Sequence, residues 1–273
     1  MDRKSLLFFI ATLAVIAAAV VLARWVDRPS APGTQAGESA RVFPAAERTG
    51  PVICLVLDDF GYTTRNLQAL KGIGAPVTLA VLPNLPYTRK VCAFARDNGM
   101  EVILHLPVEP ENEEAGLEKN TLCCGMDEAE VRSIIEDDLR SVIYARGVSN
   151  HMGSRGTRDT RLMRTVMDEL NKKDLFFLDS LTTRNSVCRQ AAVEKGVPFA
   201  SRDIFIDNKI DADAIRGQLK SLEKIALAGG RALGIGHDRP LTIEVLRVAV
   251  PEMRRKGIRF VKLSDYVEGK RRQ

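Results

Sequence analysis

Two adjacent carboxylates, Asp58 and Asp59, directly follow the apolar run Val52–Leu57. This run is rich in β-branched residues and does not alternate with polar ones, which is typical of a strand buried on both faces of a parallel sheet. Ligands of such α/β folds bind at the carboxyl ends of the strands. Two acids there cannot both be buried and ionised without a counter-charge, so a metal ion or a cationic partner is expected. The alternative is that they cap the following helix, which needs only one Asp.

All three histidines of the chain, His105, His151 and His237, lie at or just beyond the carboxyl end of a predicted strand. A single buried histidine is usually structural, but three at one edge beside an Asp pair indicate a common site. Imidazole and carboxylate are ligands for zinc or a similar divalent ion, and three protein ligands leave a coordination position for water. The remaining Asp and His would be free to transfer protons.

Strand and helix patterns alternate along the chain. Strands are expected at Val52–Leu57, Pro76–Leu82, Glu101–Leu106, Val148–His151, Leu175–Leu178, Val197–Ile206 (one or two), Ala232–Ile235 and Ile258–Leu263. Helices are expected near Thr63–Lys71, Tyr87–Asn98, Asp127–Arg146, Asp159–Lys173, Ser186–Lys195, Asp211–Ala228 and Thr242–Lys256, the last with a kink at Pro251. This order predicts a parallel (β/α) barrel of seven or eight strands, distorted or incomplete, with a doubly wound open sheet as the alternative.

The N-terminus predicts export. Arg3 and Lys4 precede an uncharged apolar run, Leu6–Ala23, whose length lies between that of a signal peptide core and that of a membrane-spanning helix. We expect residues 1–26 to be an uncleaved anchor in the inner membrane, with a cleaved signal peptide as the alternative. Residues 27–50 are a Pro/Gly/Ser-rich linker, and residues 51–273 form the folded domain, which is expected in the periplasm.

Composition excludes some classes of function. The 40 basic and 35 acidic residues give a net charge of only +5, and no basic run is interleaved with aromatic residues, so nucleic-acid binding is not expected. No glycine-rich phosphate-binding loop is present. The five cysteines do not have the spacing of a zinc ribbon or a redox pair, and their odd number leaves at least one thiol unpaired in a monomer.

Several motifs carry a resemblance to a known family. They are Leu57–Gly61 (Leu-Asp-Asp-Phe-Gly), His105–Pro110, Asn150–Ser154, Leu175–Ser180, Arg202–Asp207 and Ile235–His237. In this order they resemble the divergent polysaccharide deacetylase family of the YibQ type, which is related to the NodB-homology carbohydrate esterases. The resemblance extends from Pro51 to Val267, and it implies a distorted (β/α) barrel with a divalent metal ion, for which we expect zinc.

The resemblance also implies roles for individual residues. Asp58 matches the general base, and Asp59 matches the metal-binding Asp. His105 stands where the family's second motif supplies histidine ligands, and His237 matches the general acid that protonates the leaving group. His151 is assigned as the third metal ligand from its place at a strand end alone.

Two features depart from the classical deacetylases. The residue four after His105 is Glu109 instead of a second histidine, so either Glu109 or His151 takes that position. The Arg-Pro-Pro-Tyr motif that helps to stabilise the oxyanion is absent, and Arg155 and Arg202 are the candidates for its role.

The remaining candidates are supporting residues. Asp179 either holds a histidine in one tautomer or caps the turn at Ser180–Asn185. Asn150 and Ser154 are expected to stabilise the loop beside His151. Asp203 and Asp207 flank an apolar triplet, where one structural hydrogen bond is expected.

The combined prediction is a periplasmic, membrane-anchored, metal-dependent hydrolase that removes N- or O-acetyl groups from a cell-wall or other envelope glycan. The alternative is a catalytically degraded barrel that binds a glycan or an envelope protein partner. A metallohydrolase for a phosphoester is a third hypothesis, which the scarcity of basic residues near the strand ends disfavours.

Overall fold

The computed structural model describes residues 50–112 and 116–271. The predicted membrane anchor and the predicted linker up to residue 49 lie outside the described residues. Among the described residues, none of the helices is long and apolar enough to cross a membrane.

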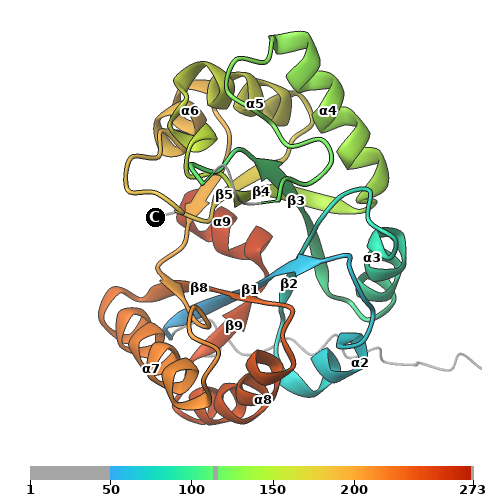
Figure 1. The fold of residues 1–273 in the computed structure, drawn as a ribbon. Helices are drawn as coiled ribbons and strands as arrows, with labels where there is room; N and C mark the ends of the chain where they lie inside the picture. Colours follow the sequence, from blue (N-terminus) through green and yellow to red (C-terminus); the bar gives the residue numbers. More distant parts are fainter. Residues whose placement is uncertain (1–49, 113–115, 272–273) are drawn as a thin grey trace, which may run out of the picture. The chain divides into compact units, whose positions relative to one another are not determined.

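Strand β1 (Val52–Phe60) belongs to a parallel sheet that has nine strands within the described residues, and it pairs with β2, β8 and β9 (Figure 1). The other strands are β2 (Thr78–Val81), β3 (Glu101–Val108), β4 (Ala145–Met152), β5 (Phe176–Asp179), β6 (Phe199–Ser201), β7 (Ile204–Phe205), β8 (Arg231–His237) and β9 (Arg259–Val261). Their order is β6-β5-β4-β3-β2-β1-β8-β7. On one side β1 pairs with β8. On the other side it pairs with β9 through Val52–Cys54 and with β2 from Val56 onward.

All the described helices but the last connect successive strands, and the last follows β9. They are α2 (Leu67–Leu70), α3 (Thr88–Asp97), α4 (Glu128–Ser141), α5 (Thr160–Lys172), α6 (Cys188–Lys195), α7 (Ala212–Gly229), α8 (Pro240–Arg255) and α9 (Leu263–Arg271), with 3-10 turns at Lys71–Ile73 and Gly156–Arg158. The predicted alternation of parallel strands and helices is therefore confirmed. The first helix is shorter than expected, helix α8 continues through Pro251, and α9 was not predicted.

The sheet is open between β6 and β7, the two ends of the strand order. Only Arg202 and Asp203 separate these strands in the sequence. The Arg202 N–H donates to the carbonyl of Asp179 at the end of β5 (3.1 Å), and the Asp203 N–H donates to the carbonyl of Leu233 in β8 (2.9 Å). The chain itself therefore bridges the gap, and the predicted barrel is an incomplete one.

Side chains of β1 enter two separate cores, because successive residues of a strand point to opposite faces. Ile53, Leu55 and Leu57 belong to the larger core between the sheet and the surrounding helices. Cys54 and Val56 belong to a smaller core inside the curled sheet. Helix α9 fills this interior with Leu263, Tyr266 and Val267. Both faces of β1 are thus covered, which explains its continuous apolar sequence.

All five cysteines are free thiols in the structure, and Cys54, Cys92 and Cys188 among them are buried. The three buried thiols thus act as small apolar groups in the core.

Candidate active site

The backbone at Asp59 brings two consecutive carboxylates to the same place. Neighbouring residues of a regular strand point to opposite faces. Asp59 instead has φ of 66°, in the left-handed region, and the pairing of β1 with β2 shifts register between Leu57 and Phe60. As a result, Asp58 Oδ2 lies 3.7 Å and Asp59 Oδ1 lies 3.3 Å from Nε2 of His105. An unusual backbone conformation of this kind is characteristic of functional sites.

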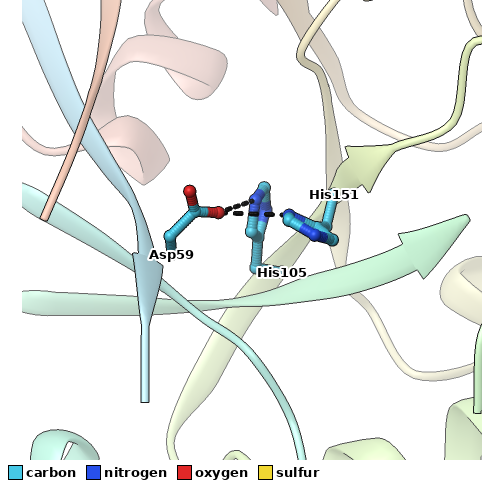
Figure 2. Close-up of side chains that lie close together, drawn as sticks. All are labelled: Asp59, His105 and His151. Atoms are coloured by element: carbon cyan, nitrogen blue, oxygen red, sulfur yellow. Dashed lines mark ion pairs between the residues drawn. The ribbon is translucent and has the colours of Figure 1, made fainter. Parts of the chain in front are cut away.

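Asp59, His105 and His151 converge from β1, β3 and β4 (Figure 2). Asp59 Oδ1 is 3.3 Å from His105 Nε2 and 3.1 Å from His151 Nδ1. The two imidazole rings meet edge to face, with their centroids 5.0 Å apart. One ligand atom from each residue lies within 4.8 Å of the other two. The parallel register places both histidines near the carboxyl ends of adjacent strands, as the sequence led us to expect.

The donor set and its protonation fit a divalent cation. A tetrahedral zinc site places its ligand atoms about 3.4 Å apart, close to the separations seen here. His105 Nδ1 lies 2.8 Å from the buried hydroxyl of Ser149, which leaves Nε2 to face the cluster. Burial lowers the pKa of His105 to about 4, so the ring is neutral at neutral pH, as a ligand must be.

Asp59 stays ionised in this environment. Burial alone would raise its pKa, but the hydrogen bonds from His105 and His151 outweigh this effect and hold the pKa well below its usual range. The cluster therefore offers one carboxylate and two imidazoles, a combination that suits zinc and other first-row divalent ions.

Asp58 has a different environment from that of its neighbour. It is 2% exposed, and its Oδ1 is buried without a hydrogen-bond partner among the described residues. Burial, followed by the charges of Asp59 and Asp207, raises the pKa of Asp58 well above its ordinary value. A carboxylate with a raised pKa and an unused oxygen is suited to accept a proton.

His237 lies opposite Asp58 in the register of β1 with β8. Its Nδ1 is 2.7 Å from Oδ1 of the buried Asp207, and its backbone N–H donates to Oδ2 of the same carboxylate (2.9 Å). The hydroxyl of Thr242 also donates to Oδ2, at 2.6 Å. Phe205 stacks on the imidazole, with ring centroids 5.9 Å apart. Asp207 thus fixes the ring and leaves Nε2 as the nitrogen available for proton transfer.

The sequence analysis did not assign Asp207 to His237, although a signal was present. Asp207 follows β7 by two residues, and it therefore ends a strand as the other site residues do. Asp179, which was considered for such a role, accepts hydrogen bonds from the Ser186 hydroxyl (2.6 Å) and the Leu181 N–H (2.8 Å) instead. Asp179 therefore caps the turn that follows β5, which is the second of the two roles considered for it.

Glu109 lies outside the Asp-His-His cluster. Its Oε1 forms an ion pair with Arg155 (3.0 Å), and its Oε2 accepts the backbone N–H of Cys124 (2.6 Å). Arg155 and Glu109 therefore neutralise each other's charge at the start of the β3–α4 connection. The structure places His151, and not Glu109, beside Asp59 and His105.

Arg202 lies at the gap between β6 and β7. Its guanidinium donates to the carbonyls of Ser180 (2.7 Å) and Leu181 (2.9 Å) and lies 3.7 Å from the centroid of the Phe205 ring. Arg202 thus supports the aromatic ring that stacks on His237. Its charge also lowers the pKa of Asp58, although burial outweighs this effect.

The other predicted supporting residues are hydrogen-bonded within loops. Asn150 accepts the N–H of Ser180 (2.9 Å) and donates to the carbonyl of Met152 (2.7 Å). The Ser154 hydroxyl accepts the N–H of Glu111 (2.9 Å), and Asp203 Oδ2 accepts the N–H of Leu233 (2.7 Å). Asn150 therefore links the β4 and β5 loops beside His151.

Known proteins resemble this chain in sequence and in fold. Residues 55–267 match the divergent polysaccharide deacetylase family. The chain belongs to this family. The chain is 36% identical over 198 residues to YibQ of Escherichia coli K12, and 34% identical over 198 residues to a protein of Haemophilus influenzae. These alignments cover 72% of the chain in both cases, but only 62% of YibQ and 70% of the Haemophilus protein.

Solved structures share the fold of this chain. A protein from Agrobacterium tumefaciens C58 has a TM-score of 0.76 at 23% identity, covering 80% of this chain and 89% of that one. The peptidoglycan deacetylase PdaC from Bacillus subtilis has a TM-score of 0.52 at 13% identity, covering 82% of this chain and 94% of that one. At these identities the similarity concerns the fold alone.

Proposed function

We propose that the protein is a metal-dependent hydrolase that removes acetyl groups from an envelope glycan. The observation that carries this proposal is the arrangement around β1. The Asp59–His105–His151 cluster lies beside the buried Asp58, and the register of β1 with β8 places His237 opposite Asp58. A ligand cluster, a proton acceptor and a proton donor thus meet at one edge of the sheet.

Asp59, His105 and His151 would hold the metal ion, for which the donor set favours zinc. When bound, such an ion supplies Lewis acidity toward an acyl carbonyl and activates water. Asp58, whose carboxylate lies next to the cluster, would accept the proton of the attacking water. His237, oriented by Asp207, gives a proton from Nε2 to the leaving amine or alcohol.

The proposal includes the location of the enzyme. Arg3, Lys4 and the apolar run Leu6–Ala23 support an N-terminal anchor in the inner membrane, with the domain in the periplasm. Release into the periplasm after signal cleavage is the alternative. A glycan of the cell envelope is the substrate class that this location would offer.

Elemental analysis of the purified full-length protein, prepared without added metal and without a histidine tag, is the first test. About one equivalent of a divalent ion in the wild type and its loss in Asp59→Ala are expected. Acetate release from acetylated glycans would then be measured on the same preparations. Metal-loaded protein that releases no acetate from N- or O-acetylated glycans would refute the proposed reaction.

A binding role without turnover is the second candidate. The observation that favours it is the pairing of Arg155 with Glu109, because this ion pair engages one of the two arginines considered for oxyanion stabilisation. A protein that neither contains metal nor takes it up, yet binds a glycan or an envelope protein, would support this role.

A further inference from the structure

Two exposed tyrosines lie in the loops that follow the carboxyl ends of β1 and β2. Tyr62, in the loop after β1, is 50% exposed, and Tyr87, in the loop after β2, is 40% exposed. The N–H of Tyr87 donates to the carbonyl of Gly61 (3.0 Å), which joins the two loops directly. Tyr62 follows Asp59 by three residues. The charge of Asp59 contributes to the raised pKa of Tyr62, so Tyr62 lies near the cluster, and the loop of Tyr87 is joined to the same turn.

The close approach of the two loops depends on Gly61. This residue has φ of 129°, a conformation that side chains rarely adopt. A Cβ at this position would lie 3.1 Å from Leu85 Cδ1 and 3.2 Å from the Leu82 carbonyl. The backbone between Asp59 and Tyr62 is thus fixed against the β2–α3 loop, which keeps the segments that carry Tyr62 and Tyr87 together.

Tyr62 is held at its polar end and exposed at its ring. Its hydroxyl donates to Glu118 of the β3–α4 connection. Burial of the hydroxyl, followed by this contact with Glu118, raises the pKa of Tyr62, so the side chain remains a neutral phenol. Leu117, which precedes Glu118, is 54% exposed and adds an apolar surface on the same connection.

The rings of Tyr62 and Tyr87 have no stacking partner among the described residues. The third exposed tyrosine, Tyr144, differs in this respect. The guanidinium of Arg96 lies 5.1 Å from the Tyr144 ring centroid and donates to its hydroxyl (2.5 Å). The two tyrosines beside the cluster therefore present uncovered aromatic surface in a protein whose aromatic content is only 5%.

An uncovered tyrosine beside a hydrolytic centre suits a sugar ring. A pyranose has an apolar face of C–H groups and a polar rim of hydroxyls, and tyrosine combines an apolar ring with a polar tip in the same way. The side-chain partner of Tyr62 is the acidic Glu118, which disfavours an anionic ligand at this ring. The patch therefore favours a neutral saccharide.

We propose that Tyr62 and Tyr87 form a stacking subsite for the sugar unit that adjoins the acetylated one. The inference rests on the proposed function, since it takes the Asp-His-His cluster as the place of the scissile acetyl group. It implies that the substrate is an oligosaccharide or a polymer, because a free monosaccharide could not occupy both positions.

Calorimetric titration of the full-length protein tests the subsite without any need for turnover. The probes are the β-1,4-linked tetrasaccharide of N-acetylglucosamine and N-acetylglucosamine itself. We expect the tetrasaccharide to bind more tightly than the monosaccharide. Tyr62→Ala and Tyr87→Ala should each weaken tetrasaccharide binding about tenfold. Monosaccharide binding should be unchanged in both variants.

Two further variants serve as controls. Tyr144→Ala removes an equally exposed tyrosine far along the chain and should leave the affinity unchanged. Tyr87→Phe keeps the ring and should bind nearly as the wild type does. Circular dichroism would verify that all variants are folded.

The inference is overturned if the wild type does not prefer the tetrasaccharide, or if the double variant Tyr62→Ala/Tyr87→Ala binds it as tightly as the wild type does. Its failure can be distinguished from failure of the proposed function. If acetate release does not change when both tyrosines are replaced, the proposed hydrolase activity stands and the proposed subsite is refuted. If tetrasaccharide binding depends on the tyrosines but no acetate is released, the proposed subsite stands and the proposed hydrolase activity is refuted.

Discussion

Asp207 holds His237 through both oxygens of one buried carboxylate, with Oδ1 2.7 Å from the ring Nδ1 and Oδ2 2.9 Å from the backbone nitrogen. Burial would raise the pKa of Asp207, but the hydrogen bond from His237 outweighs it and lowers the pKa. The carboxylate is therefore ionised and directs the imidazole so that Nε2 is free. This relationship makes Asp207 a positioning residue for the proposed general acid.

Replacement of Asp207 by Asn should reduce acetate release by about 10²-fold or more, because the amide no longer fixes the tautomer of His237. The basic limb of the pH–rate profile should shift, and metal content should remain that of the wild type. Thr242→Val removes one hydrogen bond to Asp207 and should have a much smaller effect. Equal effects of the two variants would indicate a purely structural role for Asp207.

Ser149 should influence metal affinity although it is not a ligand. Its hydroxyl is the hydrogen-bond partner of His105 Nδ1. Ser149→Ala should weaken metal binding about 10–100-fold, because the ring loses its fixed orientation. Competition with a chromogenic chelator would measure the change.

Ser154→Ala provides the matched control, since the Ser154 hydroxyl accepts a hydrogen bond from Glu111 and lies outside the cluster. Its metal affinity should equal that of the wild type. If Ser149→Ala also bound metal as the wild type does, the orientation of His105 would not depend on this hydroxyl.

Asp58→Asn should retain the metal ion and lower turnover about 10²–10⁴-fold, because the amide cannot accept a proton. Elemental analysis and acetate release on the same preparation would separate the two effects. Loss of metal from this variant would instead place Asp58 among the ligands. Asp58 Oδ2 lies 3.7 Å from His105 Nε2, only slightly farther than Asp59 Oδ1 at 3.3 Å.

The buried Asp138 should make the stability of the fold depend on pH. It is 0% exposed, its Oδ1 accepts hydrogen bonds from Asn84 (2.9 Å) and Asn120 (3.1 Å), and burial is the main cause that raises its pKa to about 7. The folded state therefore binds a proton more tightly than the unfolded state, whose Asp pKa is about 3.9. The free energy of unfolding should fall as the pH rises from about 4 to about 7, by at most about 4 kcal/mol.

Asp138→Asn should remove this contribution, because the amide oxygen keeps the acceptor for Asn84 and Asn120 without a charge. Urea unfolding between pH 4 and pH 8 would measure the slope in both proteins. Asp137→Asn, at the half-buried neighbouring position, should retain most of the pH dependence. A slope in Asp138→Asn equal to that of the wild type would assign the pH dependence to other groups.

The sequence determined those properties that follow from local pattern and from the geometry of parallel sheets. The apolar run before Asp58 predicted a strand covered on both faces, and alternating strands and helices predicted parallel pairing. Because the carboxyl ends of parallel strands share one edge, the positions of His105, His151 and His237 alone were sufficient to predict that they lie at the same edge. The motifs at these strand ends were also sufficient to predict the family.

Other properties depended on contacts between residues far apart in the chain. The sequence did not distinguish Glu109 from His151 as the neighbour of Asp59, because the register of β3 with β4 decides which side chains converge. It did not distinguish Asp179 from Asp207 as a partner of His237, because β8 pairs with β7 and not with β5. The left-handed backbone at Asp59 and the filling of the sheet interior by α9 likewise depend on tertiary packing. Asp tolerates the left-handed conformation but does not require it.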